Sequence, residues 1–407
     1  MCLGAFMSRS MRRVGISAFL MLVVSVAGCS AGADVARDEL SVVVQRDGVV
    51  FTSEAIPDEV LDQLATNRVI VLGETHHLRE HWEFTASLLE KLHARGFRQL
   101  LVEQPQMVDW LLDDWAMGGE LETGWTAPAH LQNKFSLIRD FNETLPIADR
   151  IHVRSIDVNE EHFGGASAFH DLLEMTTQQL PSSGPLGEFL NVGYVFSDPA
   201  EQSQSINSLL AALEVDRSTL TTTWGSAWYD TVVELVDVES ASIDIRTKRT
   251  EDDNSAARAR EEVIKQLADA RISGYSYGTV INIGGHHAQK SHLKGTEQEW
   301  LGDYLVHRST AIDGTVIVVS VTSAKTELES GSTGTPVDIL GTSPEHELLR
   351  VIAEAWPAKT VFLPLDDALF SDRTIAVNSE DTIYIASLKD HYDAVLQYGF
   401  AHRMSSG

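Results

Sequence analysis

The chain has 407 residues and a formal net charge of −28 at neutral pH, which disfavours nucleic acid and anionic membrane surfaces as partners. Hydrophobic residues make up 43% of the chain, a composition typical of a globular protein that forms one large domain or two ordinary ones. Acidity of this size favours solubility and says little about the fold.

The first 28 residues predict a lipoprotein signal peptide. Three arginines precede the apolar run Val14–Val26, which ends in the residues V-A-G-C before the chain becomes polar. A basic start, a short apolar core and small residues at its end are typical of a secretory signal, and the core is short for a transmembrane helix. The ending resembles a bacterial lipobox, in which cleavage precedes the cysteine. An uncleaved anchor or a misassigned start codon is the alternative.

Cysteine usage agrees with this interpretation. The only cysteines are Cys2 and Cys29. If the chain is cut before Cys29, the exported protein keeps one cysteine, which carries lipid, and it has neither an internal disulfide nor a cysteine nucleophile. We therefore expect an exported protein of the cell envelope, attached to the membrane through lipid on Cys29.

We predict a tether over residues 29–39 and a single α/β domain over residues 40–407. Leu40–Thr52 alternates around a polar Arg-Asp-Gly turn and predicts a β-hairpin. Residues 165–272 predict a large helical insertion, and Ala324–Ser343 predicts a loop. Helices are expected at Leu78–Ala94, in the tryptophan-rich segment with Trp110 and Trp115 that follows the strand Leu100–Val102, and at Glu345–Trp356. Strands are expected at Val69–Leu72, Leu100–Val102, Ile151–Ile156, Val280–Ile283, Val316–Val321, Val361–Leu363, Ile383–Ala386 and Ala394–Leu396.

Apolar strands that alternate with amphipathic helices predict a mostly parallel β-sheet flanked by helices on both faces. In such a sheet the carboxyl ends of the strands meet at one edge, where ligands bind. The predicted strands end in polar residues that could form one cluster: Glu74, His76 and His77 after the first, Glu103 after the second, Asp157 after the third, and His286 and His287 after the fourth. A glutamate directly after a buried run is costly unless it is paired or solvated. A functional cluster is therefore favoured over ordinary strand ends.

Glycines precede both histidine pairs. Gly73 and Gly284 would let the backbone turn sharply and approach a ligand closely, as would Gly285. The helix starts that follow offer free N–H groups, which suit an anionic ligand or intermediate. We expect Gly73, Gly284 and His286 to lie on the ligand side of the edge.

Arg260 lies on the apolar stripe of a predicted helix. An arginine in that position either extends its head group to solvent or pairs with a buried acid, and the acid-rich edge favours pairing. Its neighbour Glu261 is expected to point away, unless the helix starts there.

His77-Leu78-Arg79-Glu80-His81 spells H-x-x-E-H, the inverted form of a zinc-protease motif. That motif needs both histidines within one helix, whereas His77 is predicted at a strand-to-helix turn. Five-residue matches are frequent in a chain with 15 histidines, so Glu80 and His81 are expected to be solvated. No G-x-S-x-G, P-loop or dinucleotide-binding glycine pattern occurs in the sequence.

Several segments together resemble the superfamily of erythromycin esterases, ChaN-type haem-binding lipoproteins and Tiki/TraB-like proteins. The matching segments are LGETHH, GFRQLLVEQPQMVDWLLDDWAMGGE, Asp157, Arg260-Glu261, NIGGHHA and KDHYDAVLQYGF, and the resemblance spans most of residues 66–400. It implies an EreA/ChaN-like fold. It also implies either hydrolysis by a histidine base, as in the esterases, or the metal-linked histidines and glutamate of ChaN and Tiki proteins. The length and the helical insertion are closer to the esterases, whereas the G-x-x-H spacing and the lipobox are closer to ChaN.

Two functional hypotheses follow. The first is a hydrolase of a small-molecule ester or a peptide, in which His76 or His77 is the general base. Glu74 and Glu103 would orient that base or bind a divalent ion such as Zn, Mn or Fe, with His76, Glu103 and His287 as ligands. His287 would otherwise polarise the carbonyl, and Arg260 would stabilise negative charge. The second is a protein that binds haem or iron at the same edge without turnover. A third, structural, interpretation is that the histidines only hold the fold together.

Overall fold

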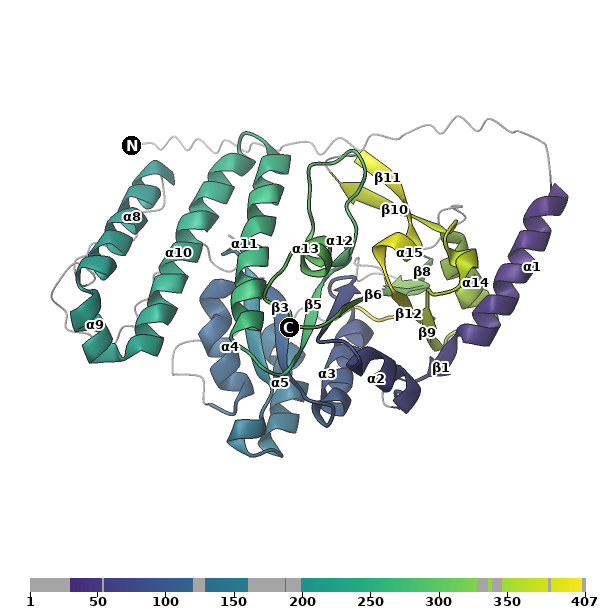
Figure 1. Cartoon of the computed structure of the whole chain (residues 1–407), viewed down its shortest axis with the longest axis horizontal. Coiled ribbons are helices and arrows are strands. Elements are labelled where there is room, and N and C mark those ends of the chain that lie inside the picture. The colour runs from purple at the N-terminus through teal and green to yellow at the C-terminus, as the bar shows by residue number, and fades with distance from the viewer. Residues whose placement is uncertain are drawn as a thin grey trace, which may run out of the picture.

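The computed structural model describes residues 30–52, 55–119, 129–159, 187, 199–327, 336–338, 346–379 and 382–404. The predicted signal peptide, the predicted lipidation site Cys29 and part of the predicted helical insertion lie outside these residues. Figure 1 shows the arrangement, with a sheet in the middle and a group of helices to one side of it.

The centre of the fold is an eight-stranded, mostly parallel sheet, as the sequence predicts. Its strands lie in the order β1 (Val49–Phe51), β9 (Thr360–Pro364), β12 (Ala394–Tyr398), β6 (Val316–Ser323), β2 (Val69–Glu74), β5 (Gly278–Gly284), β3 (Phe97–Pro105) and β4 (His152–Asp157). The six strands from β12 to β4 are parallel, whereas β9 is antiparallel to both of its neighbours.

Alternate side chains of the strands enter two separate apolar cores. Ile70 and Leu72 face one core, and Val69 and Val71 face the other. The first core is covered by α2 (Asp58–Ala65), α3 (Arg79–His93), α4 (Asp109–Ala116) and α5 (Ala129–Glu143). The second is covered by α1 (Ser30–Asp47), α11 (Asp253–Ser273), α13 (Leu301–His307) and α14 (Glu347–Ala355). The molecule therefore has the layered helix–sheet–helix architecture that near-continuous apolar strands predict.

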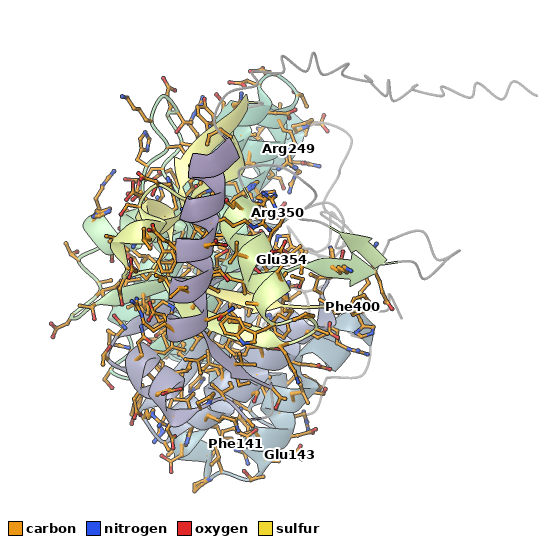
Figure 2. All side chains as sticks on the ribbon, turned by 90° about the vertical axis from the view of Figure 1, so that its right-hand side faces the viewer. Phe141, Glu143, Arg249, Arg350, Glu354 and Phe400 are labelled. Atoms are coloured by element: carbon orange, nitrogen blue, oxygen red, sulfur yellow. The ribbon has the colours of Figure 1, made fainter. Side chains whose placement is uncertain are left out.

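The hairpin predicted for Leu40–Thr52 is wrong, because most of this segment belongs to helix α1. The helix begins at Ser30, so the segment predicted as a tether is also helical. Leu40, Val43 and Val44 are buried, whereas Val42 is 64% exposed. This spacing of three and four is helical, and only the short strand β1 follows the helix. Figure 2 looks onto this side, where Arg37 of α1 pairs with Glu354 of α14 at 2.6 Å between Nη2 and Oε2.

Helices occupy the described part of the predicted insertion. They are α8 (Pro199–Val215), α9 (Arg217–Trp224), α10 (Ser226–Arg249) and α11, which leads into β5. Apolar residues of α8 and α10, among them Ile206 and Val232, join the first core. The insertion thus packs onto the sheet domain. No helix of the described residues is both long and apolar enough to cross a membrane.

The C-terminal part adds two small antiparallel sheets. The predicted loop at Ala324–Ser343 contains β7 (Lys325–Glu327) and β8 (Pro336–Asp338), which pair with each other. The strand predicted at Ile383–Ala386 lies in β11 (Thr382–Ser387), which pairs with β10 (Thr374–Ser379) outside the main sheet. Short helical segments complete the fold: α12 (Gly285–Ala288), α15 (Leu388–His391), and single 3₁₀ turns at Gln106–Val108, Ile147–Asp149 and Ala368–Phe370.

Candidate active site

The four strands with polar endings are neighbours in the sheet, in the order β2, β5, β3 and β4. They are parallel, so their carboxyl ends lie at the same edge. Glu74 is paired in register with Gly284, and Pro105 with Asp157. The sheet therefore brings together the residues that the sequence placed at separate strand ends.

Glu103 is at the centre of the cluster, and its side chain is 11% exposed. One carboxylate oxygen, Oε2, accepts a hydrogen bond from the backbone N–H of Gly284 at 2.7 Å. The other, Oε1, accepts one from Arg260 Nη2 at 2.6 Å. Two histidines approach the same carboxylate, with His76 Nε2 at 3.6 Å from Oε2 and His287 Nε2 at 3.5 Å from Oε1. Glu103 thus links β5, α11 and both histidine segments.

Arg260 pairs with two buried acids, as expected from its place on the apolar stripe of α11. Besides Glu103, it donates from Nε to Asp157 Oδ1 at 2.8 Å and from Nη2 to Asp157 Oδ2 at 2.6 Å. Asp157 also accepts the N–H of Val158 at 2.7 Å. A two-point contact of this kind fixes the orientation of both groups. Arg260 therefore joins the ends of β3 and β4 and neutralises part of their negative charge.

Of the first histidine pair, His76 is the member that enters the cluster. Its Nδ1 lies 3.3 Å from Glu74 Oε1, and its Nε2 faces Glu103. The side chain of His76 is 49% exposed, whereas that of Glu74 is 7% exposed. His76 is thus an accessible imidazole held between two carboxylates. His77 is exposed and takes a left-handed backbone conformation, with φ at 63°.

Of the second pair, His287 is the member that enters the cluster. Its Nδ1 is held by Glu261, for which the sequence predicted another orientation. Glu261 was expected to point away, but it is 0% exposed. It accepts from His287 Nδ1 at 2.5 Å and from the backbone N–H of Leu301 at 2.6 Å. His286 is exposed, and its ring centre lies 6.2 Å from that of Trp300.

These contacts shift the pKa values of His287 and Glu103 in opposite directions. Burial alone would lower the pKa of His287, but the negative charges of Glu261 and Glu103 outweigh it and raise the pKa to about 9. Burial alone would raise the pKa of Glu103, but His287, Arg260 and His76 lower it to about 2. At neutral pH the cluster therefore holds an imidazolium at His287 and a carboxylate at Glu103.

The glycines at this edge permit close approach rather than a turn. None of Gly73, Gly284 and Gly285 has a positive φ. A Cβ on Gly284 would lie 2.8 Å from His76 Nε2, and one on Gly73 would lie 2.7 Å from the Cβ of Ala288. A side chain at Gly73 would clash with Ala288, and one at Gly284 would push the His76 ring aside, so the predicted close approach is observed and the predicted sharp turn is not.

The H-x-x-E-H motif does not form a metal site, and its second histidine is not solvated. His81 is 1% exposed, and Glu80 is half-buried and pairs with His402. The expectation that both are solvated is wrong because the first turn of α3 lies beneath the C-terminal segment Ala401–Met404.

The predicted metal ligands do not fit a metal ion in this arrangement. Both oxygens of Glu103 already accept hydrogen bonds, from Arg260 and from the Gly284 N–H. A guanidinium in direct contact with the central carboxylate would repel a divalent cation. Within the described residues, no group of three or more His, Cys, Asp or Glu side chains is arranged to hold a metal ion. The prediction of haem binding stays a prediction.

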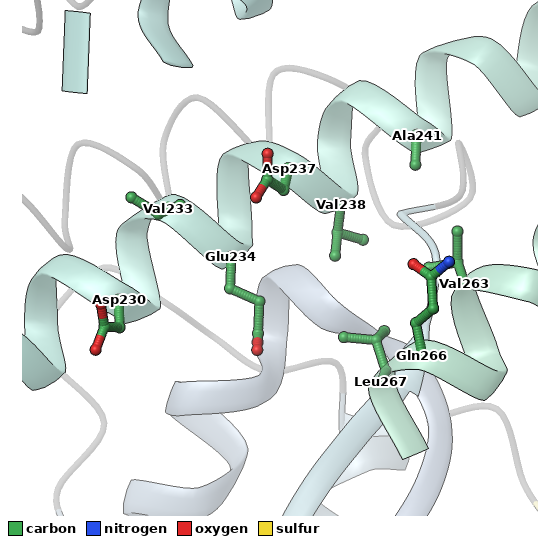
Figure 3. A pocket seen from close by; sticks show the side chains of 9 residues that line it. All are labelled: Asp230, Val233, Glu234, Asp237, Val238, Ala241, Val263, Gln266 and Leu267. Carbon is green, nitrogen blue, oxygen red and sulfur yellow. The ribbon is translucent and has the colours of Figure 1, made fainter. Parts of the chain in front are cut away.

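A groove of about 290 Å³ lies between α10 and α11 and is separate from this cluster. Figure 3 shows its apolar and acidic side chains, which come from the facing sides of the two helices. None of the predicted site residues lines it. Its lining residues are Asp230, Val233, Glu234, Asp237, Val238, Ala241, Val263, Gln266 and Leu267.

Comparison with known proteins identifies the class of fold. No protein-family model and no curated protein matches the sequence. Three solved structures match the fold over almost their whole length. A Bacillus cereus protein has a TM-score of 0.65 at 11% identity, covering 90% of this chain and 98% of its own. A succinoglycan biosynthesis protein has a TM-score of 0.62 at 13% identity, covering 93% and 100%.

The third is a mutant of erythromycin esterase EreC in its open conformation, with a TM-score of 0.60 at 12% identity, covering 88% of this chain and 98% of its own. The chain therefore shares its α/β fold with these three structures, one of which is an erythromycin esterase, and it has a histidine–carboxylate cluster at the carboxyl edge of its sheet. The fold that the sequence resemblance implied is confirmed.

Proposed function

We propose that the protein is a hydrolase that cleaves an ester bond, with His76 as the general base. The observation that carries this proposal is the position of the His76 ring, which is half exposed and held between the carboxylates of Glu74 and Glu103. An accessible imidazole oriented by carboxylates is suited to take a proton from water near neutral pH. The fold shared with an erythromycin esterase supports an ester as the substrate class over a peptide.

In the proposed reaction, His76 removes a proton from water as the water oxygen attacks the carbonyl carbon. The carbonyl oxygen then carries the negative charge of the tetrahedral intermediate. His287 is cationic at neutral pH because of Glu261 and Glu103, and its Nε2–H supplies a donor for that oxygen. Collapse of the intermediate breaks the C–O bond, and the leaving alcohol takes the proton from His76.

Arg260 has a positioning role in this proposal. Its guanidinium donates to both Glu103 and Asp157, so it holds the carboxylate that orients His76. No step is assigned to a metal ion, because the residues at the edge are already paired with one another.

The location of the protein is a further part of the proposal. The basic start, the apolar run and the V-A-G-C ending support export and attachment to a membrane through lipid on Cys29. The substrate would then be met outside the cytoplasm.

The test uses a panel of aryl esters and lactones after dialysis against a chelator. The wild-type protein is expected to hydrolyse at least one of them, and His76→Gln is expected to lose that activity with an unchanged melting temperature. Haemin is titrated in parallel. A haem absorption band together with no hydrolysis across the panel would replace the hydrolase by the haem-binding alternative.

A further inference from the structure

The H-x-x-E-H motif has no part in the proposed chemistry. Its residues nevertheless form hydrogen bonds with the backbone next to His76 and with the C-terminal segment of the chain. The motif spans the turn between β2 and α3, and His76 is the residue directly before it. The contacts come from two sides, the interior of the sheet and the C-terminal segment Ala401–Met404. They act on the loop Thr75–Leu78, which carries His76.

From the interior, His81 holds the loop through the residue next to His76. Its Nδ1 accepts the backbone N–H of Thr75 at 3.2 Å, so Nδ1 is unprotonated and the ring hydrogen is on Nε2. Nε2 in turn donates to Ser323 Oγ at 2.9 Å. Burial lowers the pKa of His81 to about 4 despite nearby Glu74 and Glu80, so the ring stays neutral in this tautomer near neutral pH.

The packing around His81 leaves its ring in one orientation. The ring stacks on Tyr398 of β12, with 5.5 Å between the ring centres. His81 and Ser323 are both almost fully buried. The burial of the ring and its stack on Tyr398 keep Nδ1 in place as the acceptor for the Thr75 N–H.

From the outside, the C-terminal segment pairs with the same loop. The carbonyl of His77 accepts the N–H of Met404 at 2.8 Å, and the carbonyl of His402 accepts the N–H of Arg79 at 2.9 Å. Glu80 accepts the N–H of His402 at 2.6 Å. These bonds hold His77 in its left-handed conformation, which few residues other than glycine, asparagine, aspartate and histidine adopt.

We propose that His81 and the segment Ala401–Met404 are positioning elements that fix the loop Thr75–Leu78 and thereby the direction of the His76 ring. This rests on the proposed function in one respect, the assignment of His76 as the base. The H-x-x-E-H motif is then a support for the preceding histidine and not a ligand set.

The test compares two variants that each keep one of the two polar contacts of His81. His81→Asn keeps an acceptor near the position of Nδ1 and loses the contact with Ser323, whereas His81→Gln keeps a donor near Nε2 and loses the acceptor for Thr75. Hydrogen–deuterium exchange of the peptide that contains Thr75 reports the contact directly. We expect about tenfold faster exchange of Thr75 in His81→Gln than in His81→Asn, and a kcat lower by about tenfold or more with an unchanged KM.

Ser323→Ala is the matched control, because it removes the second contact of His81 and leaves the first. It is expected to keep the slow exchange of Thr75 and to retain kcat. Equal exchange and equal kcat in His81→Asn and His81→Gln would overturn the proposal. Fast exchange in His81→Gln with no hydrolysis by the wild type would reject His76 as the base and would support positioning of the loop.

The C-terminal segment gives a second arm, in which both variants lose the Met404 side chain that packs against the first core and differ from each other in the backbone N–H. Met404→Pro removes the N–H that His77 binds, and Met404→Ala keeps it. We expect a lower kcat and faster exchange of the loop only in Met404→Pro. The same kcat and exchange in both variants would remove the C-terminal segment from the proposal.

Discussion

The contact between Glu261 and His287 makes a prediction about stability and pH. Glu261 is fully buried and holds Nδ1 of a histidine whose side chain is 12% exposed. In Glu261→Gln the amide oxygen can still accept the N–H of Leu301, but the amide nitrogen is a donor and faces Nδ1. A donor in that position favours the neutral imidazole. The substitution should therefore discharge His287 while leaving the local packing in place.

The magnitude follows from the pKa of His287, which the cluster raises from 6.5 to about 9. A difference of this size corresponds to roughly 3 kcal/mol of stability. Because the folded-state pKa is the higher one, this contribution is fully present below pH 6.5 and is lost as the pH rises through about 9. In Glu261→Gln the loss between these two pH values should disappear, and the pKa of His287 should fall to about 6.5 or below.

The assay is urea denaturation at a series of pH values from 6 to about 9.5, combined with NMR titration of the His287 ring. Glu262→Gln is the matched control, since Glu262 is the next residue of α11 and its side chain is 62% exposed. It should keep the pH dependence of the wild type. If His287 still titrates near pH 9 in Glu261→Gln, the proposed origin of its charge is wrong.

Three further predictions concern the rest of the account. Arg260→Gln removes the guanidinium that pairs with Glu103 and Asp157 and should lower the free energy of unfolding by about 3–5 kcal/mol in urea denaturation; a loss below about 1 kcal/mol would contradict the pairing. Gly284→Ala places a Cβ 2.8 Å from His76 Nε2, so it should displace that ring and reduce kcat by about tenfold or more. Gly285→Ala is the control and should be tolerated, because its Cβ would have no atom closer than 3.6 Å. Radiolabelled palmitate should enter the wild-type protein in cells and not Cys29→Ala; equal labelling of both would exclude lipidation at this cysteine.

The sequence was sufficient to predict the fold and the edge at which the cluster lies. Near-continuous apolar strands read as a parallel sheet, and parallel strands bring Glu74, Glu103 and Asp157 to one edge. The order of the strands is not encoded in any local pattern. That β5 lies between β2 and β3, so that Gly284 can bind Glu103, emerges only from the three-dimensional pairing.

Glu261 and His81 were misplaced although the sequence carried a signal for both. Glu261 shares its helical face with Ile264 and Ala268, at offsets of three and seven, and these residues are buried. His81 lies one helical turn before Thr85 and two turns before Leu88, on the buried side of α3. In both cases the charge or polarity of the side chain suggested exposure, but the periodicity of the apolar residues was the better guide.

The hairpin at the start of the domain was predicted incorrectly because its apolar residues fit a strand pattern as well as a helical one. Leu40, Val42 and Val44 alternate, and β-branched residues favour strands. The same segment also contains the helical spacing of Leu40, Val43 and Val44, and packing against α14 selects it. Local pattern alone cannot decide between two periods that fit the same few residues.

The central claim is that His76, and not its neighbour His77, is the base of a hydrolase that works without a bound metal ion. The most direct measurement is kcat/KM on the best ester of the panel after chelator dialysis, for the wild type, His76→Gln and His77→Asn. Asparagine tolerates the left-handed conformation of position 77, so that variant should keep most of the activity, and His76→Gln should lose about 10²-fold to 10⁴-fold. Full activity in His76→Gln, or activity in the wild type only after a divalent metal is added back, would contradict the account.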